Sequence, residues 1–457
     1  MQSINPATGA LLRSYTPHTP AQVEERIRAA VNAQREWSRR APRDRGALLK
    51  RIAALLIERS HPLAAIMTEE MGKPIAEAVA EVRKCAWVCA HYCEEGPGML
   101  ATESIEVGGP EAMVRYDPLG LVFAVMPWNF PFWQVFRMAA PALVAGNALL
   151  VKHAPNTQGC MKAMEDLALE AGLPPGLLSS LVIDVDQVPA VIHDPRIAAV
   201  TVTGSERAGA AVASEAGRAL KKAVLELGGS DPFIVLEDAD LDAAAAAGVT
   251  SRCLNSGQSC CAAKRFVVVE SVAEAFEGKL AAGMAALRIG DPMEPGIQVG
   301  PMARPDLRDA LDDQVKRSLA AGARVLTGGG PPQLSEGLDP SSYFAPTVLT
   351  GVSLDSPAAT EETFGPLAAV IRVKDEAEAI AVANDTEYGL AASVWTADRA
   401  RGKRIAAQLH TGGVFINKMA GSDPRVPFGG VGKSGYGREL GVWGLREFVN
   451  VKTVWVE

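Results

Sequence analysis

Short apolar stretches alternate with helical stretches between residues 120 and 227, and this alternation restricts the fold more than any other feature of the 457-residue chain. Each apolar stretch has the length of a buried strand, and helices are expected near 131–145, 157–171, 186–193 and 205–216. Because strands that alternate with helices pair in parallel through right-handed crossovers, the pattern predicts a doubly wound sheet, which binds ligands beyond the carboxyl ends of its strands. The predicted strands are Leu121–Met126, Ala148–Lys152, Leu178–Ile183, Ala198–Thr203 and Ala223–Leu227.

The rest of the chain predicts a helical region, a second α/β region and two segments of β character. Residues 20–95 carry apolar side chains at helical spacing. Residues 106–119 form a polar, turn-rich arm, and residues 229–430 form the second α/β region. Further strands are expected at Phe266–Val269, Val394–Thr396 and Val449–Val456.

The overall charge and composition are those of an ordinary globular protein. Hydrophobic residues make up 48% and charged residues 21%, and the formal net charge is −8. This acidic balance argues against nucleic acid or an anionic membrane surface as a partner. No apolar run approaches the length of a membrane span, and the first residues show no signal peptide, so a cytoplasmic protein is expected.

The seven cysteines are not spaced as a disulfide framework, which fits a reducing compartment. Cys85, Cys89 and Cys93 recur every four residues, so they lie on one face of a predicted helix. His91 falls off that face, and no second group of ligands follows it. We therefore expect a buried stripe of side chains there and no metal site.

The segment Asn255–Ala262 holds two adjacent cysteines behind a Gly-Gln turn. Its small and amide-bearing residues let a substrate approach a thiol, and they supply hydrogen-bond donors to an oxygen that becomes negative there. One of the two thiols, Cys260 or Cys261, could therefore attack a carbonyl carbon. The alternative is that both cysteines are buried and pack as small hydrophobic residues.

Polar residues stand at the ends of several predicted strands. Thr203–Gly209 joins a strand to a helix, and its N–H groups and hydroxyl could bind a phosphate or simply cap the helix. Lys152 could reach a ribose or phosphate or stay in solvent. Asn129 supplies an amide donor, and a buried Glu226 would have a raised pKa suited to a general base, or would cap a loop. Together these groups suggest thiol catalysis beside a nucleotide.

The ordered set of these segments resembles the aldehyde dehydrogenase superfamily over essentially the whole chain. The resemblance implies an α/β fold with a doubly wound parallel cofactor-binding sheet, a second α/β catalytic domain and a small β oligomerisation arm. The dinucleotide-binding domain would comprise residues 1–105 and 120–228, the catalytic domain 229–430, and the arm and C-terminal tail 106–119 and 431–457. The matching segments are Pro127–Pro131, Lys152, Gly204–Gly209, Glu226–Gly229, Asn255–Cys260, Glu362–Pro366 and Pro427–Gly430.

The resemblance also implies the roles of the catalytic residues. Cys260, which follows Gly-Gln-x, would be the nucleophile, and Cys261 would not. Asn129 and the backbone N–H of Cys260 would hold the oxyanion of a thiohemiacetal, and Glu226 would activate the water that hydrolyses the resulting thioester. The nicotinamide dinucleotide would be held by Trp128, Lys152, Pro155, Gly204, Ser205, Glu362 and Phe364.

Three residues carry the prediction of the substrate. Succinate-semialdehyde dehydrogenases resemble this chain in having an arginine at the place of Arg137, where a buried guanidinium would bind the distal carboxylate of the substrate. Ser422 and Arg425 lie in a segment that is also similar to theirs, and they are predicted as further carboxylate ligands. Leu254 stands where some members carry a second arginine, which departs from that subgroup. The alternative for Arg137 is an internal salt bridge.

The residues after Lys152 bear on the choice of cofactor. Relatives that prefer NAD often place a glutamate three residues after this lysine, where it accepts the ribose hydroxyls, whereas this chain has Pro155. No carboxylate would repel a 2′-phosphate at that position. We therefore expect NADP to be accepted and preferred, with NAD as the other possible cofactor.

The predicted function is oxidation of succinic semialdehyde, or of a close omega-carboxylated aldehyde, to the dicarboxylic acid. A general aliphatic aldehyde dehydrogenase is the nearest alternative. A cysteine thioesterase or hydrolase without redox chemistry and a non-catalytic protein on the same fold are the others. The arm and the tail indicate a homodimer or homotetramer, because edge strands can extend the sheet of a partner.

Overall fold

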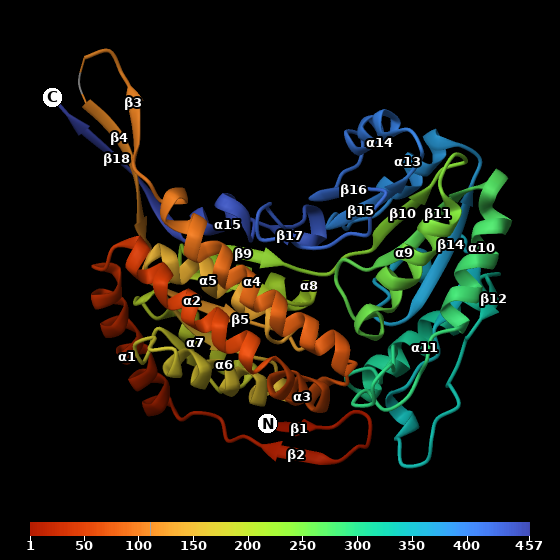
Figure 1. Cartoon of the computed structure of the whole chain (residues 1–457), viewed down its shortest axis with the longest axis horizontal. Helices are drawn as coiled ribbons and strands as arrows, with labels where there is room; N and C mark the ends of the chain where they lie inside the picture. Colours follow the sequence, from red (N-terminus) through yellow and green to blue (C-terminus); the bar gives the residue numbers. More distant parts are fainter. Residues whose placement is uncertain (110) are drawn as a thin grey trace.

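Two sheets of mainly parallel strands form the centre of the computed structural model, which describes residues 1–109 and 111–457 (Figure 1). The first sheet contains β5 (Leu121–Val125), β6 (Ala148–Lys152), β7 (Leu178–Ser180), β8 (Ile197–Thr203), β9 (Lys222–Glu226) and β17 (Gly435–Tyr436). Their order is β17-β9-β8-β5-β6-β7, and within this sheet β17 pairs antiparallel while the other pairs are parallel. The predicted doubly wound parallel sheet is confirmed.

The predicted strand Leu178–Ile183 is shorter in the structure because β7 ends at Ser180. Leu181 still donates its N–H to the carbonyl of Val151 at 2.8 Å, but it lies outside the strand. Leu181 and Ile183 are fully buried. Their apolar character therefore reflects burial and not membership of a strand. A short apolar run in the sequence does not distinguish these two cases.

Helices connect the strands of the first sheet and pack around it. The connecting helices are α5 (Trp133–Ala145), α6 (Gln158–Glu170), α7 (Val188–His193) and α8 (Glu206–Arg218). The helical region predicted before the sheet contains α1 (Pro20–Ser38), α2 (Pro42–Glu58), α3 (Ser60–Met71) and α4 (Ile75–Met99). Helix α4 packs against α2, α3 and α5. Cys85 and Cys89 lie fully buried on α4, in agreement with the predicted buried stripe, whereas Cys93, its third member, is only partly buried.

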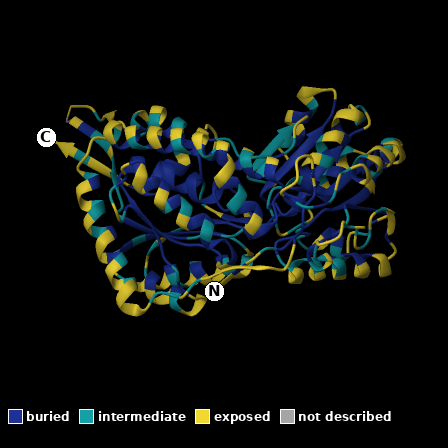
Figure 2. Ribbon diagram, turned by 60° about the horizontal axis from the view of Figure 1, so that its bottom comes forward, coloured by how far each residue is buried: buried dark blue, intermediate teal, exposed yellow. Residues whose placement is uncertain are grey.

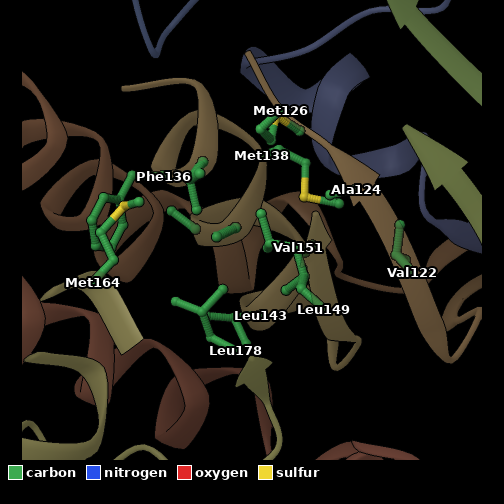
Figure 3. Close-up of a cluster of buried hydrophobic side chains, with 14 of the residues drawn as sticks. Val122, Ala124, Met126, Phe136, Met138, Leu143, Leu149, Val151, Met164 and Leu178 are labelled. Atoms are coloured by element: carbon green, nitrogen blue, oxygen red, sulfur yellow. The ribbon is translucent and has the colours of Figure 1, made fainter. Parts of the chain in front are cut away.

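Helix α5 is buried along its whole length against the first sheet. Figure 3 shows Phe136, Met138 and Leu143 of this helix in one apolar cluster with side chains of β5, β6 and α6. Each such side chain contributes about 1.5–3 kcal/mol on burial, so the helix is firmly held. Gly146 ends it in a left-handed cap with φ 101°. Because α5 follows the Pro127–Pro131 turn directly, its packing also positions that turn.

The second sheet confirms the predicted second α/β region. It contains β10 (Asp231–Val235), β11 (Ala263–Val269), β12 (Arg324–Thr327), β13 (Thr347–Thr350), β14 (Leu367–Val373), β15 (Ala391–Trp395) and β16 (Gly413–Ile416). Their order is β12-β13-β14-β11-β10-β15-β16, with β12 antiparallel to β13. The helices of this region are α9 (Leu241–Cys253), α10 (Glu270–Ala285), α11 (Pro305–Ala320), α12 (Pro357–Thr360), α13 (Glu376–Asn384) and α14 (Arg399–Ala406).

A small antiparallel sheet projects beside the first sheet (Figure 1). It contains β3 (Glu103–Glu106), β4 (Glu111–Pro118) and β18 (Val449–Val456) in the order β18-β4-β3. Figure 2 shows that much of it is exposed, as expected for an arm that leaves the body of the molecule.

Other short elements complete the fold. They are the hairpin of β1 (Gln2–Ile4) and β2 (Leu11–Ser14) and the helix α15 (Gly441–Arg446). Strand β3 begins before the predicted arm, and β17 belongs to the first sheet although it lies within the predicted tail. The domain boundaries themselves stay a prediction.

No helix in the described part of the chain combines the length and the apolar character that a membrane crossing requires. Within residues 1–109 and 111–457, no group of three or more His, Cys, Asp or Glu side chains is arranged to hold a metal ion.

Candidate active site

The two cysteines lie in a tight loop between α9 and β11, residues 254–261, here called the cysteine loop. Asn255, Ser256 and Gly257 adopt left-handed conformations in succession, with φ angles of 56°, 52° and 76°. For residues other than glycine this region costs about 1–2 kcal/mol each. Such a conformation persists only where surrounding contacts hold it.

Those contacts come from three sides of the loop. Asn255 donates its N–H to Glu77 Oε2 at 2.6 Å and its side-chain amide to the carbonyl of Asn129 at 2.7 Å. Arg252 Nη2 donates to the carbonyl of Gly257 at 2.5 Å. Gln258 Oε1 accepts the N–H of Ala303 at 2.8 Å. The loop is therefore fixed to α4 and to the Pro127–Pro131 turn.

Cys260 lies between two cavities. The first has a volume of about 240 Å³, and the second, at the ends of β8 and β9, has a volume of about 390 Å³. Among the described residues, Cys260 and Gln134 line both cavities, whereas Cys261 lines the first. Molecules bound in the two cavities would therefore meet at the Cys260 sulfur.

Asn129 is buried beside Cys260 and lines the second cavity. Its Nδ2 donates to the carbonyl of Gln258 at 3.1 Å, and its Oδ1 accepts from Gln134 Nε2 at 2.9 Å. The carbonyl of Asn129 accepts from Lys73 Nζ at 2.9 Å. Because a primary amide carries two N–H donors, one of them remains for an oxygen atom of a ligand.

Strand β9 ends at Glu226, which is 3% exposed and lines the second cavity. Among the described residues, no group donates a hydrogen bond to its Oε1. Burial, and next the nearby charge of Glu439, raise the pKa of Glu226 well above its ordinary value. A carboxylate with a raised pKa is a stronger base once it is ionised.

The thiols of Cys260 and Cys261 are neighbours, and each shifts the pKa of the other. The neighbouring Cys261 thiol and burial raise the pKa of Cys260, and the neighbouring Cys260 thiol lowers the pKa of Cys261 to about 6. Ser259 Oγ lies 3.7 Å from the Cys261 sulfur, and the charge of Lys84 further lowers the pKa of that thiol. The protonation of each thiol therefore depends on the other.

The second cavity is lined by two aromatic rings and a carboxylate. Trp128 and Phe364 meet edge to face with their ring centroids 5.8 Å apart. Glu362 accepts the N–H of Gly229 at 3.0 Å and the ammonium of Lys264 at 2.7 Å.

Gly204 and Ser205 lie at the start of helix α8, where backbone N–H groups favour a phosphate. Ser205 also caps this helix, because its Oγ accepts the N–H of Ala208 at 3.3 Å. These residues fit a nicotinamide dinucleotide, with apolar rings at one end, a carboxylate for ribose hydroxyls and a helix N-terminus for phosphate.

Lys152 and Pro155 lie outside the described lining of the second cavity. Lys152 ends β6, and burial lowers its pKa. Pro155 opens a short 3₁₀ helix, Pro155–Thr157. Their contact with a cofactor stays a prediction.

The first cavity brings together two of the three predicted carboxylate ligands. Arg137 and Ser422 line it, and Arg137 is buried in an ion pair with Glu439. The internal salt bridge considered for Arg137 is therefore present. Arg425 lies outside the described lining, where it pairs with Asp423 at 2.6 Å over the ring of Trp87.

Several residues of the site escaped the sequence analysis. Glu77 and Lys84 project from α4 into the first cavity, Lys264 supports Glu362, and Glu439 pairs with Arg137. Glu77 and Lys84 are seven residues apart, which places them on one face of a helix. This spacing can be read from the sequence, but the sequence does not show that this face of the helix points toward Cys260.

The chain is similar along its whole length to proteins whose names state an enzymatic activity. It is 49% identical over 454 residues to Sad of Escherichia coli (strain K12), a succinate semialdehyde dehydrogenase named for NAD(P)+, with 99% of this chain and 97% of that protein covered. It is 45% identical over 458 residues to succinate-semialdehyde dehydrogenase 1 of Mycobacterium tuberculosis (strain ATCC 25618 / H37Rv), named for NADP(+), with 99% of each covered.

A solved structure shares the fold. Succinic semialdehyde dehydrogenase from Streptococcus pyogenes in complex with NADP+ matches with a TM-score of 0.96 and 36% identity over 100% of this chain and 99% of that chain. The model of the aldehyde dehydrogenase family matches residues 1–454. The resemblance identified from the sequence motifs is confirmed, and the chain belongs to the aldehyde dehydrogenase family.

Proposed function

We propose that the protein oxidises succinic semialdehyde, or a close omega-carboxylated aldehyde, to the dicarboxylic acid with NADP or NAD. One observation carries the proposal: Cys260 lies where the two cavities meet. The aldehyde would enter the first cavity, and the cofactor would lie in the second. In this arrangement the first sheet serves the cofactor and the second sheet carries the nucleophile, as in the proposed domain division.

The first chemical step uses the sulfur of Cys260. After the thiol has given its proton to solvent, the thiolate forms a bond to the aldehyde carbon, and the π electrons of the carbonyl move to its oxygen. Asn129 Nδ2 and the N–H of Cys260 donate hydrogen bonds to that oxygen. Because Gln134 and Gln258 already fix Asn129, this donor needs no reorganisation when the charge develops.

When bound, the nicotinamide ring supplies the acceptor for the hydride that leaves the aldehyde carbon. The acid then remains attached to Cys260 as a thioester. Glu226 takes a proton from water, the water oxygen bonds to the acyl carbon, and the Cys260 thiolate leaves. The raised pKa of Glu226 makes its ionised form a suitable base for this step.

Several observations support the choice of substrate and cofactor. Relatives at 45–49% identity are named succinate-semialdehyde dehydrogenases, with NAD(P)+ or NADP(+) in their names. The first cavity holds cationic side chains that favour a carboxylated aldehyde over a neutral one. Pro155 brings no carboxylate toward a 2′-phosphate, which favours NADP.

We further propose a cytoplasmic homo-oligomer, a dimer or a tetramer. The cysteines of the described chain are all free, which suits a reducing compartment. Strand β18 forms an edge of the small sheet and exposes Val451, Trp455 and Val456, a surface suited to pairing with another copy.

The test is a matched pair of variants assayed with both cofactors. Wild type should produce reduced cofactor from succinic semialdehyde, faster with NADP than with NAD. Cys260→Ser should abolish this absorbance change, whereas Cys261→Ser should keep it. Acid formation without reduced cofactor would support a hydrolase, and equal rates on butanal would support a general aliphatic aldehyde dehydrogenase.

A further inference from the structure

The ammonium of Lys264 lies between the nucleophile and the second cavity. Lys264 is 0% exposed, and its Nζ donates to Glu362 Oε1 at 2.7 Å and to the carbonyl oxygen of Cys260 at 2.9 Å. A third hydrogen bond goes to the carbonyl oxygen of Gly229. Because a lysine ammonium carries three N–H donors, each of them has an acceptor here. The buried charge is therefore fully hydrogen-bonded, as a charge in a protein interior requires.

An irregularity in strand β11 explains how Lys264 reaches this position. In the pairing of β10 with β11, Asp231 faces Ala263 and Pro232 faces Arg265, so Lys264 is the extra residue of a β-bulge. A bulge changes the direction of the side chains around it, and bulges are common next to active sites. The next side chain, Arg265, serves the fold, since its guanidinium donates to three backbone carbonyls.

Lys264 is more important for Glu362 than for the nucleophile. The cysteine loop has other anchors, because Glu77 and Arg252 also bind it. Among the described residues, the carboxylate of Glu362 accepts hydrogen bonds from Lys264 and from the N–H of Gly229 alone. Loss of the Lys264 ammonium would therefore free Glu362 and leave the cysteine loop in place.

The second oxygen of Glu362, Oε2, is left for a ligand. The described residues donate no hydrogen bond to it, and a Cβ atom on Gly228 would overlap it. Gly228 and Glu362 both line the second cavity, and the Glu362 side chain is 20% exposed. The fully buried Lys264 cannot itself touch a cofactor, so its effect on the cofactor passes through Glu362.

A second buried carboxylate, Asp231, lies near Lys264 but serves another group. Its Oδ1 accepts the N–H of Ala391 at 3.1 Å, and within the described part of the chain it forms no ion pair with Lys264. Glu362 is therefore the anion that balances the Lys264 charge. A buried ion pair contributes little stability compared with apolar side chains of the same shape, so a role in the site explains this pair better.

We infer that Lys264 is a positioning residue for the cofactor, which fixes Glu362 so that Oε2 faces the second cavity at a set distance from Cys260. This inference rests on the proposed aldehyde oxidation, in which the carbon bound to Cys260 gives up a hydride. One ammonium holds both Glu362 and the Cys260 carbonyl, so it links the two sides of that step directly. Such positioning matters because small displacements of reacting groups cost much of the rate.

The first measurement is the dissociation constant of NADP without aldehyde, by isothermal titration calorimetry. The variants are Lys264→Met and Glu362→Gln, and the control is Lys279→Met, which removes the exposed lysine of the Lys279–Asp242 pair on α10. Lys264→Met should raise the constant about 10- to 100-fold, the range for loss of a hydrogen bond to a charged group. Lys279→Met should leave it unchanged.

A double variant distinguishes positioning through Glu362 from general damage. When Lys264→Met is combined with Glu362→Gln, the constant should stay close to that of Glu362→Gln alone, because both changes remove the same interaction. An unchanged constant in Lys264→Met, or losses that multiply in the double variant, would overturn the inference. Lys264→Gln, which keeps an amide donor, replaces Lys264→Met if the latter fails to fold.

Hydrolysis of p-nitrophenyl acetate without cofactor is the second measurement, since it uses Cys260 and Glu226 and no hydride leaves this ester. Its rate in Lys264→Met should stay close to that of wild type, because the cysteine loop keeps its other anchors. An equal loss of ester hydrolysis and of cofactor binding would show that Lys264 merely holds the loop, against the inference. A wild type that hydrolyses the ester and binds NADP, but forms no reduced cofactor from aldehydes, would instead contradict the proposed function.

Discussion

Glu81 and Glu226 are both buried near Cys260, but their surroundings differ. Glu81 pairs with Lys73 and accepts the N–H groups of Phe132 and Trp133, each at 3.0 Å. Glu226 Oε1 receives no hydrogen bond from the described residues, and its pKa is raised. Glu81, whose charge is balanced by Lys73, holds α5 in place. Glu226, whose Oε1 receives no hydrogen bond from the described residues, can exchange a proton.

Replacing Asn129 with alanine should remove one oxyanion donor. We expect kcat to fall by about 10²–10³, because the loss of such a donor has this effect in other acyl-transfer sites. The measurement is steady-state turnover, with the dissociation constant of the cofactor as control, since that constant should stay the same. Turnover near that of wild type would contradict the role of Asn129.

Glu77 should make substrate binding depend on pH. Burial raises its pKa to about 7, although the hydrogen bond from the N–H of Asn255 and the charge of Lys73 lower it; the charge of Glu81 adds to the rise. The carboxyl is therefore neutral below about pH 7 and negative above it, where it repels an anionic substrate in the same cavity. Between pH 6 and pH 8 we expect the KM for succinic semialdehyde to rise about tenfold, which corresponds to about 1.4 kcal/mol.

Two controls isolate this effect of Glu77. The KM for butanal should not follow the same curve, because butanal carries no charge. Glu77→Gln keeps an oxygen for the N–H of Asn255 and should flatten the curve for succinic semialdehyde. The same rise in Glu77→Gln would assign the pH dependence to another group.

Among the elements, the cysteine loop depends most on its neighbours. Gly257 has φ 76°, and a Cβ atom there would overlap the backbone of Gly365. The loop therefore rests directly on the segment between Phe364 and Pro366, which also borders the second cavity. Close approach of these two backbones brings the nucleophile and the cofactor site to the same point.

Gly257→Ala should damage both stability and activity. The left-handed conformation alone costs about 1–2 kcal/mol for alanine, and the overlap with Gly365 adds to it. We expect a lower thermal midpoint and a large loss of kcat. The matched control is Gly278→Ala on the exposed side of α10, where a Cβ meets no atom within 4 Å and alanine favours the helix. Equal thermal midpoints for the two variants would contradict this account.

At the scale of the whole molecule, the small sheet has few contacts with the two large ones. Strand β18 pairs with β4 from Val449 to Val456, and most of its residues are exposed. Trp455 is 53% exposed on the same strand as the exposed Val451 and Val456, so apolar side chains gather on this part of the surface. These exposed apolar side chains are the reason that we propose this arm as the surface that pairs with a second copy of the chain.

A chain that ends at Phe448 should lose self-association. Removal of β18 takes away the exposed edge and its apolar side chains, so the molar mass measured by light scattering should fall to that of a smaller assembly. A chain that ends at Val456, and so lacks Glu457 alone, is the control and should keep the mass of the full protein. An unchanged mass after removal of β18 would place the interface elsewhere.

Much of the fold followed from local patterns in the sequence. The strands near 121, 148, 197 and 222 and the helices between them were predictable, because apolar runs and helical spacing depend on neighbouring residues. The end of β7 was not predictable, since burial and strand pairing produce the same apolar run. Likewise, Glu439, the partner of Arg137, lies more than 300 residues further along the chain. No motif around Glu439 indicated that it would form this ion pair.

The sequence by itself determined the family, the parallel sheets and the identity of Cys260, Asn129 and Glu226 as the predicted catalytic set. Those features depend on residue type and order, which a motif records directly. Only the tertiary structure decided which charges are compensated, because ion pairing depends on distances between segments that are remote in the chain. It paired Arg137 with Glu439 and Lys264 with Glu362, two pairs whose members lie far apart in the sequence.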